Sequence, residues 1–414
     1  MNSRKHTKIC IDGVDGSGKT TIHSLLRKAY PNLEIQDRGM LTRLTDVYPD
    51  DHPKTLDNDT LYIVLDADVE ICHNRILARN AKSKSEGKEI KTDKYDEPVL
   101  LFKYKNRFVR LAIEYQIPYV DTSNQLINET FNHVINIIEN NHTEYILPNP
   151  DLIDASKLPI LIEGCSKIVR ALNDEYNIIE YKPTVYSHKK QREGEVPGTD
   201  IERMQMTRNI IFLLEQNMIP HAYVYVGKKY VLSKKLDLER DIPNIEVVVK
   251  RCYIGSDAHR YYAMKDMKTR WGTSLIGDRN RYPQPIVRFD WRNPNRHPEN
   301  GTPMGDETIS DMLANYLIDV EKAKDLAIRT FDTLKEHFDK FNIFFEDVCF
   351  MITTDGKMHW SEISQDCGRY KLKNDDSYSA LDKDVWRAGG TSELVLDKWH
   401  QMTSLVHEYT KNNY

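Results

Sequence analysis

The segment Ile9–Thr21, which reads ICIDGVDGSGKTT, decides the fold of the first part of the chain. Its short apolar start predicts a strand, and Ile22, Leu25 and Leu26 behind it have the spacing of one helix face. The residues between them follow the pattern GxxxxGK[ST], whose glycines let backbone N–H groups point inward at phosphate oxygens. The start of the helix adds positive potential at the same place. The segment therefore predicts a site for a nucleoside triphosphate.

Individual roles follow from the same pattern. Lys19 is expected to reach the β- and γ-phosphates of ATP and to act in catalysis, and Thr20 is expected to bind Mg²⁺. The residues expected to bind ATP are Gly13, Asp15, Gly16, Ser17, Gly18, Lys19, Thr20 and Thr21.

Composition narrows the class of protein. A chain of 414 residues is too long for one core and predicts two or three domains. The net charge of −5 gives no overall attraction to nucleic acid, although a local basic channel stays open as an alternative. Six scattered cysteines without a CxxC pair predict a reducing compartment and no structural zinc. With a polar N-terminus and no apolar run of membrane length, we expect a cytoplasmic protein with no membrane partner; an oligomer stays open.

A short strand after the first helix ends in Asp37-Arg38. A carboxylate at the carboxyl end of a strand beside the phosphate loop is suitably placed to hold Mg²⁺ or to orient an acceptor, so both residues are predicted to be catalytic. The alternative is an Asp-Arg pair that only caps a loop.

The rest of the first domain alternates strands and helices. Leu61–Asp66 reads as a buried parallel strand, and the next helix carries Arg75 and Arg79 on one face. Asn80–Tyr95 then predicts a loop without apolar periodicity, which is either a mobile lid over phosphates or a solvated loop. The cations of this predicted lid are Lys82, Lys84, Lys88, Lys91 and Lys94.

A helix over Phe102–Ile113, a strand over Ile117–Asp121 and a helix over Ile127–Ile138 complete a predicted parallel three-layer α/β domain, residues 1–142. With IDGVDGSGKTT and the strand LYIVLDAD, this domain resembles the thymidylate kinase branch of the P-loop nucleotide kinases. The resemblance implies phosphoryl transfer from ATP with Mg²⁺, with Arg75 and Arg79 binding substrate.

One departure concerns the phosphoryl acceptor. Kinases of that branch place a strand and helices that bind the acceptor monophosphate between the P-loop helix and the Asp-Arg strand, whereas here Tyr30 leads straight to Leu33. An open acceptor site would take a larger substrate, such as a modified nucleotide or a base within DNA.

The second half predicts an α+β domain over residues 158–414, after a linker at 143–157 rich in Asn, Pro and Asp. Strand patterns alternate with a helix over Ile201–Gln216, a long amphipathic helix over Asp311–His337 and a final helix over Glu393–Thr410. The predicted strands are Ile160–Ile162, Ile168–Leu172, Asn177–Tyr181, Ala222–Val226, Lys229–Leu232, Ile245–Val249, Phe341–Ile352 and Met358–Glu362.

This half resembles the SAICAR synthetases, ATP-grasp-like enzymes of purine synthesis that join aspartate to a carboxylated aminoimidazole ribonucleotide. The resemblance rests on blocks in a shared order: EGCSKIVR from Glu163, MIPH from Met218, LSKKLD from Leu232, VVVKR from Val247 with Gly255-Ser256, GDETIS from Gly305, FED from Phe345, SEISQDCGR from Ser361 and DKDVWR from Asp382.

The resemblance implies roles for these blocks. ATP would lie under Gly164, Ser166 and Lys167, with further contacts from Lys234 and Lys235. The residues implied to bind the ribonucleotide substrate are Lys250 or Arg251, Gly255, Ser256, Asp366, Arg369, Lys383 and Arg387. A bidentate guanidinium such as that of Arg369 suits a phosphate. Catalytic roles fall to Asp347, Glu362 and Arg369, with Mg²⁺ on Glu362.

The block DxKxEFG departs from the family pattern. Asp347 is present, but Cys349 replaces the lysine, Met351 replaces the metal-binding glutamate, and Ser361 replaces the first acid of a later block. Mg²⁺ needs carboxylate oxygens that a thioether cannot replace. Metal binding has then moved to Asp347, Glu362 or Asp366, or the reaction has changed, or this half only binds. A core position is the plain alternative for Met351.

The segment Trp271–Pro303 is rich in arginine and aromatic residues. It fits either a nucleic-acid surface with stacking rings or an ordered active-site loop, and we expect the loop. The arginines and rings of this segment are Arg279, Arg281, Tyr282, Phe289, Trp291, Arg292 and Arg296.

The sequence as a whole predicts a bifunctional enzyme of nucleotide metabolism, a P-loop nucleotide kinase joined to an ATP-dependent carboxylate–amine ligase. Its expected substrates are a nucleotide or modified nucleotide and an amino acid or other amine. Two alternatives remain, an enzyme that makes a hypermodified nucleotide, with a host-cytoplasm location if viral, and a kinase whose second half only binds nucleotide.

Overall fold

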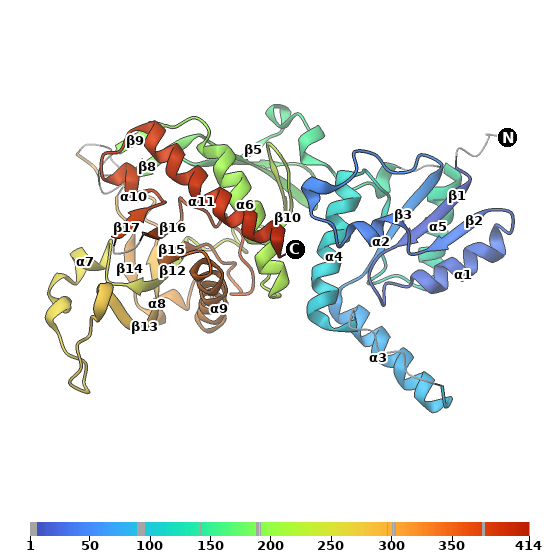
Figure 1. Cartoon of the computed structure of the whole chain (residues 1–414), viewed down its shortest axis with the longest axis horizontal. Helices are drawn as coiled ribbons and strands as arrows, with labels where there is room; N and C mark the ends of the chain where they lie inside the picture. Colours follow the sequence, from blue (N-terminus) through green and yellow to red (C-terminus); the bar gives the residue numbers. More distant parts are fainter. Residues whose placement is uncertain are drawn as a thin grey trace. The chain divides into compact units, whose positions relative to one another are not determined.

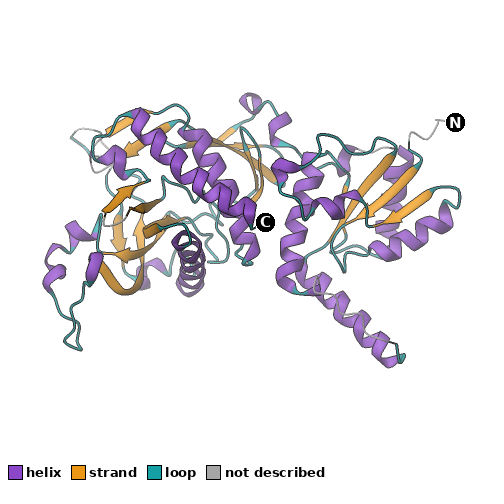
Figure 2. Ribbon diagram, in the orientation of Figure 1, coloured by secondary structure: helices purple, strands orange, loops and turns teal. Residues whose placement is uncertain are grey.

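A computed structural model describes residues 6–88, 96–140, 143–187, 190, 192–295, 297–299, 301, 304–374 and 377–413 (Figures 1 and 2). The chain forms two compact units. The first runs to Ile153 and the second from Asp154, except that Glu215–Met218 and Asn413 group with the first. The linker predicted at 143–157 spans this division and contains three short 3-10 turns.

The first unit is a parallel sheet with helices on both faces. Its strands, in the order β2-β1-β3-β4, are all parallel. They are β1 Lys8–Asp12, β2 Glu34–Asp37, β3 Thr60–Asp66 and β4 Tyr119–Asp121. The helices are α1 Lys19–Ala29, α2 Met40–Leu44, α3 Val69–Ser85, α4 Pro98–Glu114 and α5 Ile127–Asn140.

Alternate residues of the strands supply two apolar cores. Ile9 and Ile11 of β1 pack with α1 and α5, whereas Cys10 between them packs with α2, α3 and α4. This alternation is the period of a buried strand covered on both faces. The prediction of a parallel three-layer α/β unit is confirmed.

The predicted loop Asn80–Tyr95 is wrong in its first part. Helix α3 continues to Ser85, because alanine and lysine in this stretch favour helix and its exposed face needs no apolar partner. Lys82 and Lys84 are therefore helical, and Lys88 follows the helix. Lys91 and Lys94 lie outside the described residues.

The second unit is α+β, as predicted. Its helices are α6 Thr199–Gln216, α7 Asp257–Arg260, α8 Asp311–Ala314, α9 Val320–Asp339, α10 Asp384–Arg387 and α11 Ser392–Asn412. A five-stranded antiparallel sheet has the order β10-β11-β7-β6-β5, a six-stranded antiparallel sheet has the order β14-β13-β12-β15-β16-β17, and β8 pairs with β9. The first sheet comprises β5 Ile160–Glu163, β6 Lys167–Ala171, β7 Tyr176–Tyr181, β10 Tyr223–Val226 and β11 Val231–Lys234. The others are β8 Thr184–Ser187, β9 Arg192–Glu195, β12 Ile245–Cys252, β13 Arg281–Trp291, β14 Glu307–Ile309, β15 Ile343–Phe350, β16 Gly368–Asn374 and β17 Ser377–Ala380.

Helix α6 belongs to the cores of both larger sheets. Met204 and Ile211 pack against the five-stranded sheet, while Met206 and Ile210 join the core that α9 and α11 form on the six-stranded sheet. Burial on two sides also encloses polar side chains of this helix, among them Arg203 and Asn209, and a buried polar group needs partners inside the protein.

Three predicted elements differ from the structure. The helix predicted over Asp311–His337 is two helices, because Asp319 caps α9 through the backbone N–H of Lys322 (3.1 Å) and breaks the chain there. Trp271–Pro303 is not one loop, since it contains the eleven-residue strand β13. Met358–Glu362 makes only isolated bridges, at His359. Arg296 and Pro303 lie outside the described residues.

No helix in the described part of the chain is long and apolar enough to span a membrane.

Candidate functional site

The phosphate-type loop of the first unit begins at Gly13, a position that only glycine fits. Its φ is 138°, and a Cβ there would lie 2.0 Å from the carbonyl oxygen of Leu65 on β3. The loop continues through Gly16 and Gly18, also at positive φ, into α1. The strand–loop–helix geometry expected from the sequence is therefore present.

Five polar side chains meet at this loop. Lys19 is 5% exposed, and its Nζ donates to the Val14 carbonyl oxygen (2.6 Å) and lies 3.4 Å from Asp15 Oδ1. Burial lowers the pKa of the Lys19 ammonium, and Asp15 opposes that shift. Thr20 Oγ1 donates to Asp37 Oδ2 (3.3 Å), and Arg38 donates to Asp15 Oδ1 (2.7 Å). The residues predicted from sequence thus lie together.

The oxygens beside Lys19 suit Mg²⁺. Asp37 Oδ1 is buried and has no hydrogen-bond partner among the described residues. It belongs to the same carboxylate that receives the Thr20 hydroxyl. A carboxylate and a hydroxyl are hard oxygen ligands of the kind Mg²⁺ takes from proteins, so this pair fits the predicted metal.

Asp12 places the Asp37-Arg38 turn, a role that the sequence did not suggest. Its buried Oδ1 accepts hydrogen bonds from Gly39 N (2.9 Å), Thr42 N (3.1 Å) and Thr42 Oγ1 (2.5 Å). The carboxylate of β1 therefore caps α2 and fixes the chain directly after Asp37. A carboxylate directly after the apolar residues Ile9, Cys10 and Ile11 was the available signal.

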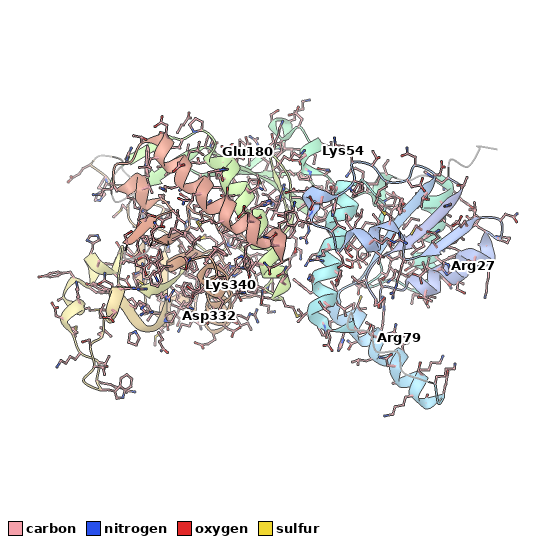
Figure 3. All side chains as sticks on the ribbon, in the orientation of Figure 1. Arg27, Lys54, Arg79, Glu180, Asp332 and Lys340 are labelled. Carbon is pink, nitrogen blue, oxygen red and sulfur yellow. The ribbon has the colours of Figure 1, made fainter. Side chains whose placement is uncertain are left out.

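Arg75 and Arg79, predicted to bind substrate, both contact protein groups in this structure, and their role toward a substrate stays a prediction. Arg75 donates to the carbonyl oxygens of Gly16 (3.2 Å) and Thr122 (2.8 Å) and to Thr122 Oγ1 (3.1 Å), so its guanidinium is used to brace the loop. Arg79 on α3 (Figure 3) lies 3.3 Å from Asp96 and is half-exposed. The spacing of four residues between Arg75 and Arg79 correctly predicted that they lie on one helix. It could not predict which groups they contact.

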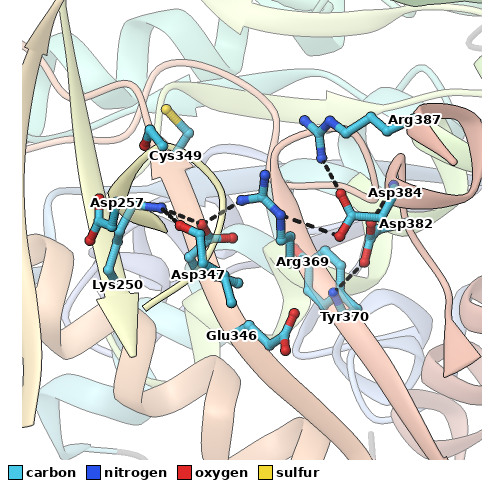
Figure 4. A network of polar contacts seen from close by, with 12 residues as sticks. Lys250, Asp257, Glu346, Asp347, Cys349, Arg369, Tyr370, Asp382, Asp384 and Arg387 are labelled. Atoms are coloured by element: carbon cyan, nitrogen blue, oxygen red, sulfur yellow. Dashed lines mark hydrogen bonds and ion pairs between the residues drawn. The ribbon is translucent and has the colours of Figure 1, made fainter. Parts of the chain in front are cut away.

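In the second unit, three strands bring together the residues Lys250, Asp347 and Arg369. Strand register pairs Lys250 with Asp347 and Asp347 with Arg369, so the side chains stand in a row (Figure 4). Asp347 Oδ2 lies 2.7 Å from Lys250 Nζ and 2.6 Å from an Arg369 nitrogen. Burial alone would raise the pKa of Asp347, but Arg369 and Lys250 outweigh it and hold that pKa below its usual range.

The row continues through Asp384. This carboxylate lies 3.3 Å from Arg369 Nε and 2.7 Å from Arg387 (Figure 4). Lys383 pairs with Asp366 at 3.0 Å. Each of these cations, implied to bind substrate, is therefore already paired with a carboxylate.

Gly255 and Ser256 lie beside this row. Gly255 has a φ of 61°, and a Cβ there would lie 2.7 Å from the guanidinium of Arg369. Ser256 Oγ accepts a hydrogen bond from Arg288 (2.9 Å), which also holds Asp290 (2.8 Å from Nε). Arg288, missed by the sequence reasoning, thus orients the serine expected to bind phosphate.

The sequence left the phosphate-binding role open between Lys250 and Arg251, and the structure places these two side chains in different surroundings. The Arg251 guanidinium lies 4.3 Å over the ring of Phe344 and 3.9 Å from Asp339 at the end of α9. It therefore does not join the row, because neighbouring residues of a strand point in different directions. Lys250 is the member of the pair that does.

The glycine-rich hairpin between β5 and β6 is tied to Glu362. Lys167 donates to the hydroxyl of Ser361, and burial lowers the pKa of its ammonium. Arg203, fully buried on α6, donates to the carbonyl oxygen of Ser166 (3.1 Å) and to Glu362 Oε1 (2.5 Å). Arg203 was not predicted; an arginine on the apolar stripe of a helix was its signal.

Glu362 is a poorer fit to Mg²⁺ than Asp37. Its Oε1 is held by Arg203, and only its buried Oε2 has no hydrogen-bond partner among the described residues. In that part of the chain no group of three or more His, Cys, Asp or Glu side chains is arranged to hold a metal. The metal role of Glu362 stays a prediction.

Cys349 places a neutral group where the family pattern has a lysine. Its Sγ donates to Glu246 Oε2 (2.7 Å), and burial together with Glu246 raises the pKa of the thiol well above its usual range. Met351, for which a core position was the alternative, is only partly buried. Lys234 ends β11, and the exposed Lys235 lies 3.4 Å from Asp174.

The second half of the chain matches a known protein family in sequence. The sequence model described as SAICAR synthetase matches residues 160–403, which is more than half of the chain. The chain belongs to the SAICAR synthetase family. "Bifunctional cordycepin biosynthesis cluster protein 3" of Cordyceps militaris is 26% identical over 465 residues, covering 84% of this chain and 51% of that protein. The chain thus spans about half the length of this relative.

Solved SAICAR synthetases are similar to about three fifths of the chain. "SAICAR synthetase (Type-2) in complex with ADP" is 21% identical with a TM-score of 0.48, covering 61% of this chain and 98% of that one. The SAICAR-synthase of Saccharomyces cerevisiae complexed with SAICAR is 15% identical with a TM-score of 0.47, covering 62% and 95%.

Proposed function

We propose that the chain is a bifunctional enzyme of nucleotide metabolism. The first unit transfers a phosphoryl group from ATP, and the second ligates a carboxylate to an amine at the expense of ATP. The relative in Cordyceps militaris carries the description bifunctional, and its 84% coverage of this chain exceeds what residues 160–414 can supply. The similarity therefore reaches into the first unit, which supports a second activity there.

In the first unit, the proposal rests on the loop that places Lys19, Thr20 and Asp37 together. Lys19 neutralises charge on the transferred phosphoryl group. Arg38 lies at the same loop, 2.7 Å from Asp15. Thr20 and Asp37 would hold Mg²⁺, and the bound ion would neutralise charge on the phosphates. Asp37 is suitably placed to orient the hydroxyl of an acceptor.

The acceptor is proposed to differ from a simple thymidylate. Helix α1 ends at Ala29 and β2 starts at Glu34, so no acceptor-binding segment stands between them. An open side of this kind admits a nucleotide with a modified or larger base, or a base within DNA.

In the second unit, the row of Lys250, Asp347 and Arg369 carries the proposal. The cations bind the phosphate of a ribonucleotide-like substrate, and Lys167 and the hairpin bind ATP. The γ-phosphoryl group passes to the substrate carboxylate, ADP leaves, and an amine then displaces phosphate from the acyl phosphate to form an amide.

Cys349 favours a second candidate. A neutral thiol on Glu246 removes one positive charge from the ligase site. That loss supports either a different amine or carboxylate from those of the family, or a unit that binds nucleotide without turning it over.

The test is ADP release and product mass from the full chain with a panel of nucleotides, amines and carboxylates. Lys19→Ala should remove only the phosphoryl transfer, and Asp347→Asn only the ligation. Lys28→Ala and Asp332→Asn (Figure 3), both at exposed positions, are matched controls that should change neither. Turnover that survives both active-site changes would contradict the proposal, and binding of ATP without ligation would leave a binding unit.

A further inference from the structure

A second group of arginines lies apart from the Lys250–Asp347–Arg369 row and is organised on aromatic rings. Arg251 lies over Phe344 at 4.3 Å, the ring of Phe344 is 5.9 Å from that of Tyr378, and Arg279 lies over Tyr378 at 5.2 Å. Arg281 stands opposite Cys252 in the strand register, next to Arg251. Arg251 and Arg279 thus lie over two rings that meet edge to face, and Arg281 is close enough to act electrostatically on Arg251.

The backbone at Arg279 is held in a conformation that costs energy. Arg279 and Asn280 have φ values of 59° and 55°, in the left-handed region that favours glycine. Asparagine tolerates this region, whereas an arginine is strained there by about 1 kcal/mol or more. Such strain persists at sites that clamp ligands, and here it turns Arg279 toward the ring of Tyr378.

The three arginines of this group have fewer carboxylate partners among the described residues than Lys250 and Arg369 have around Asp347. Within the described ranges, neither Arg279 nor Arg281 forms an ion pair; Arg281 donates only to the carbonyl oxygen of Asp278 (3.4 Å). Arg251 has one carboxylate at 3.9 Å, that of Asp339, which also pairs with Lys335 at 2.8 Å. In the part of the chain that the structure describes, the one carboxylate paired with this group is therefore that of Asp339, which is already engaged by Lys335.

We propose that Arg251, Arg279 and Arg281 bind the phosphate group of a nucleotide, beside rings that accept its base. Guanidinium forks match phosphate geometry, and an exposed ring such as Tyr378, 37% exposed, offers a surface for stacking. The ligand is either a free nucleotide or one unit of a single-stranded nucleic acid, which share this chemistry. The site adds to the ligase site and does not depend on turnover there.

The test compares binding to the full chain and to variants. AMP and a short fluorescein-labelled oligothymidylate are the two probes. In the double variant Arg279→Ala/Arg281→Ala we expect at least one probe to bind about tenfold more weakly, because two charge-assisted contacts are lost. Arg270→Ala is the matched control, since Arg270 is an exposed arginine that also lies over a ring, that of Trp271, at 4.4 Å. It should bind both probes as the unchanged protein does.

A further variant and a chemical measurement locate the effect. Arg279→Gly relieves the backbone strain, so it should keep or raise the thermal midpoint while it weakens binding. Phenylglyoxal labelling, mapped by mass spectrometry, should be blocked at Arg279 and Arg281 by the probe that binds, and not at Arg270.

Each outcome decides the matter. Loss with AMP identifies a free nucleotide as the ligand, and loss with the oligothymidylate alone identifies a single strand. Unchanged binding of both probes in the double variant, or an equal loss in Arg270→Ala, overturns the proposal.

Discussion

The buried pair of Arg203 and Glu362 makes the sharpest prediction about stability. Arg203 is fully buried, Glu362 is 4% exposed, and their closest atoms are 2.5 Å apart. Arg203→Met leaves a carboxylate without its cation in the interior, which costs about 3 to 5 kcal/mol. In a unit of this size that corresponds to a thermal midpoint lower by about 10 °C. Removing the other partner, in Glu362→Met, leaves the cation behind and should cost about the same.

The double variant Arg203→Met/Glu362→Met separates the effect of the unpaired charge from the effect of the lost hydrogen bonds. With both charges gone, the remaining loss is that of the hydrogen bonds from Arg203 to the carbonyl oxygens of Ser166 and Lys182, at about 1 kcal/mol each. We therefore expect the double variant to cost about 2 kcal/mol, far less than the sum of the single changes.

Thermal unfolding of the full chain, followed for the transition of the second unit, provides the measurement. The control is Arg170→Met, because Arg170 pairs at 3.5 Å with Glu180, which is 36% exposed, so its loss should cost about 1 kcal/mol or less. If the two single variants and the double variant are additive, or if Arg203→Met costs no more than Arg170→Met, the reasoning about a desolvated pair is refuted.

Three other changes have expected outcomes. Gly13→Ala should destabilise the first unit and abolish nucleotide binding by that unit, because its Cβ would lie 2.0 Å from the Leu65 carbonyl oxygen. The shift that ATP causes in the thermal transition of the first unit checks this, and an unchanged shift would contradict it. Burial lowers the pKa of His337 to about 4, so the stability that this neutral ring contributes above pH 6.5 is lost as the pH falls toward 4. His337 lies in an aromatic cluster, and a phenylalanine there has no proton to gain. As the pH is lowered from 8 to 5, the free energy of unfolding of His337→Phe should therefore rise by about 2 kcal/mol relative to that of the unchanged protein. Urea unfolding measures this difference, and a difference that does not depend on pH would refute it. Cys349→Lys should pair with Glu246 and raise turnover of the family's aspartate substrate, with Cys349→Ser as the control; no gain over the serine would count against it.

The first unit was the more predictable from sequence because its signals are local. A strand, a loop of fixed glycine spacing and a helix are determined by neighbouring residues, and Ile9–Thr21 folds as expected. The position of Arg75 on a helix face was equally local. Its partners, the carbonyl oxygens of Gly16 and Thr122, come from distant segments, so periodicity could not identify them.

The second unit shows the same limit at its charged residues. The blocks around Lys250, Asp347 and Arg369 were found in order, but their meeting depends on the register of three antiparallel strands. Arg203 and Arg288 were missed because each acts through partners far away along the chain. The predicted helix over Asp311–His337 failed for a local reason, since apolar spacing continued across the cap at Asp319.

The matches to the family and the departures from it separate along β15. Asp347, which matches the family, lies in the row with Lys250 and Arg369. Cys349, two residues after Asp347 on the same strand, departs from the family and donates a hydrogen bond to Glu246. The residues proposed to recognise a substrate phosphate are therefore intact, and the change falls among groups proposed to act on the carboxylate and the amine. This separation supports an enzyme that keeps a ribonucleotide-like substrate and alters the group joined to it.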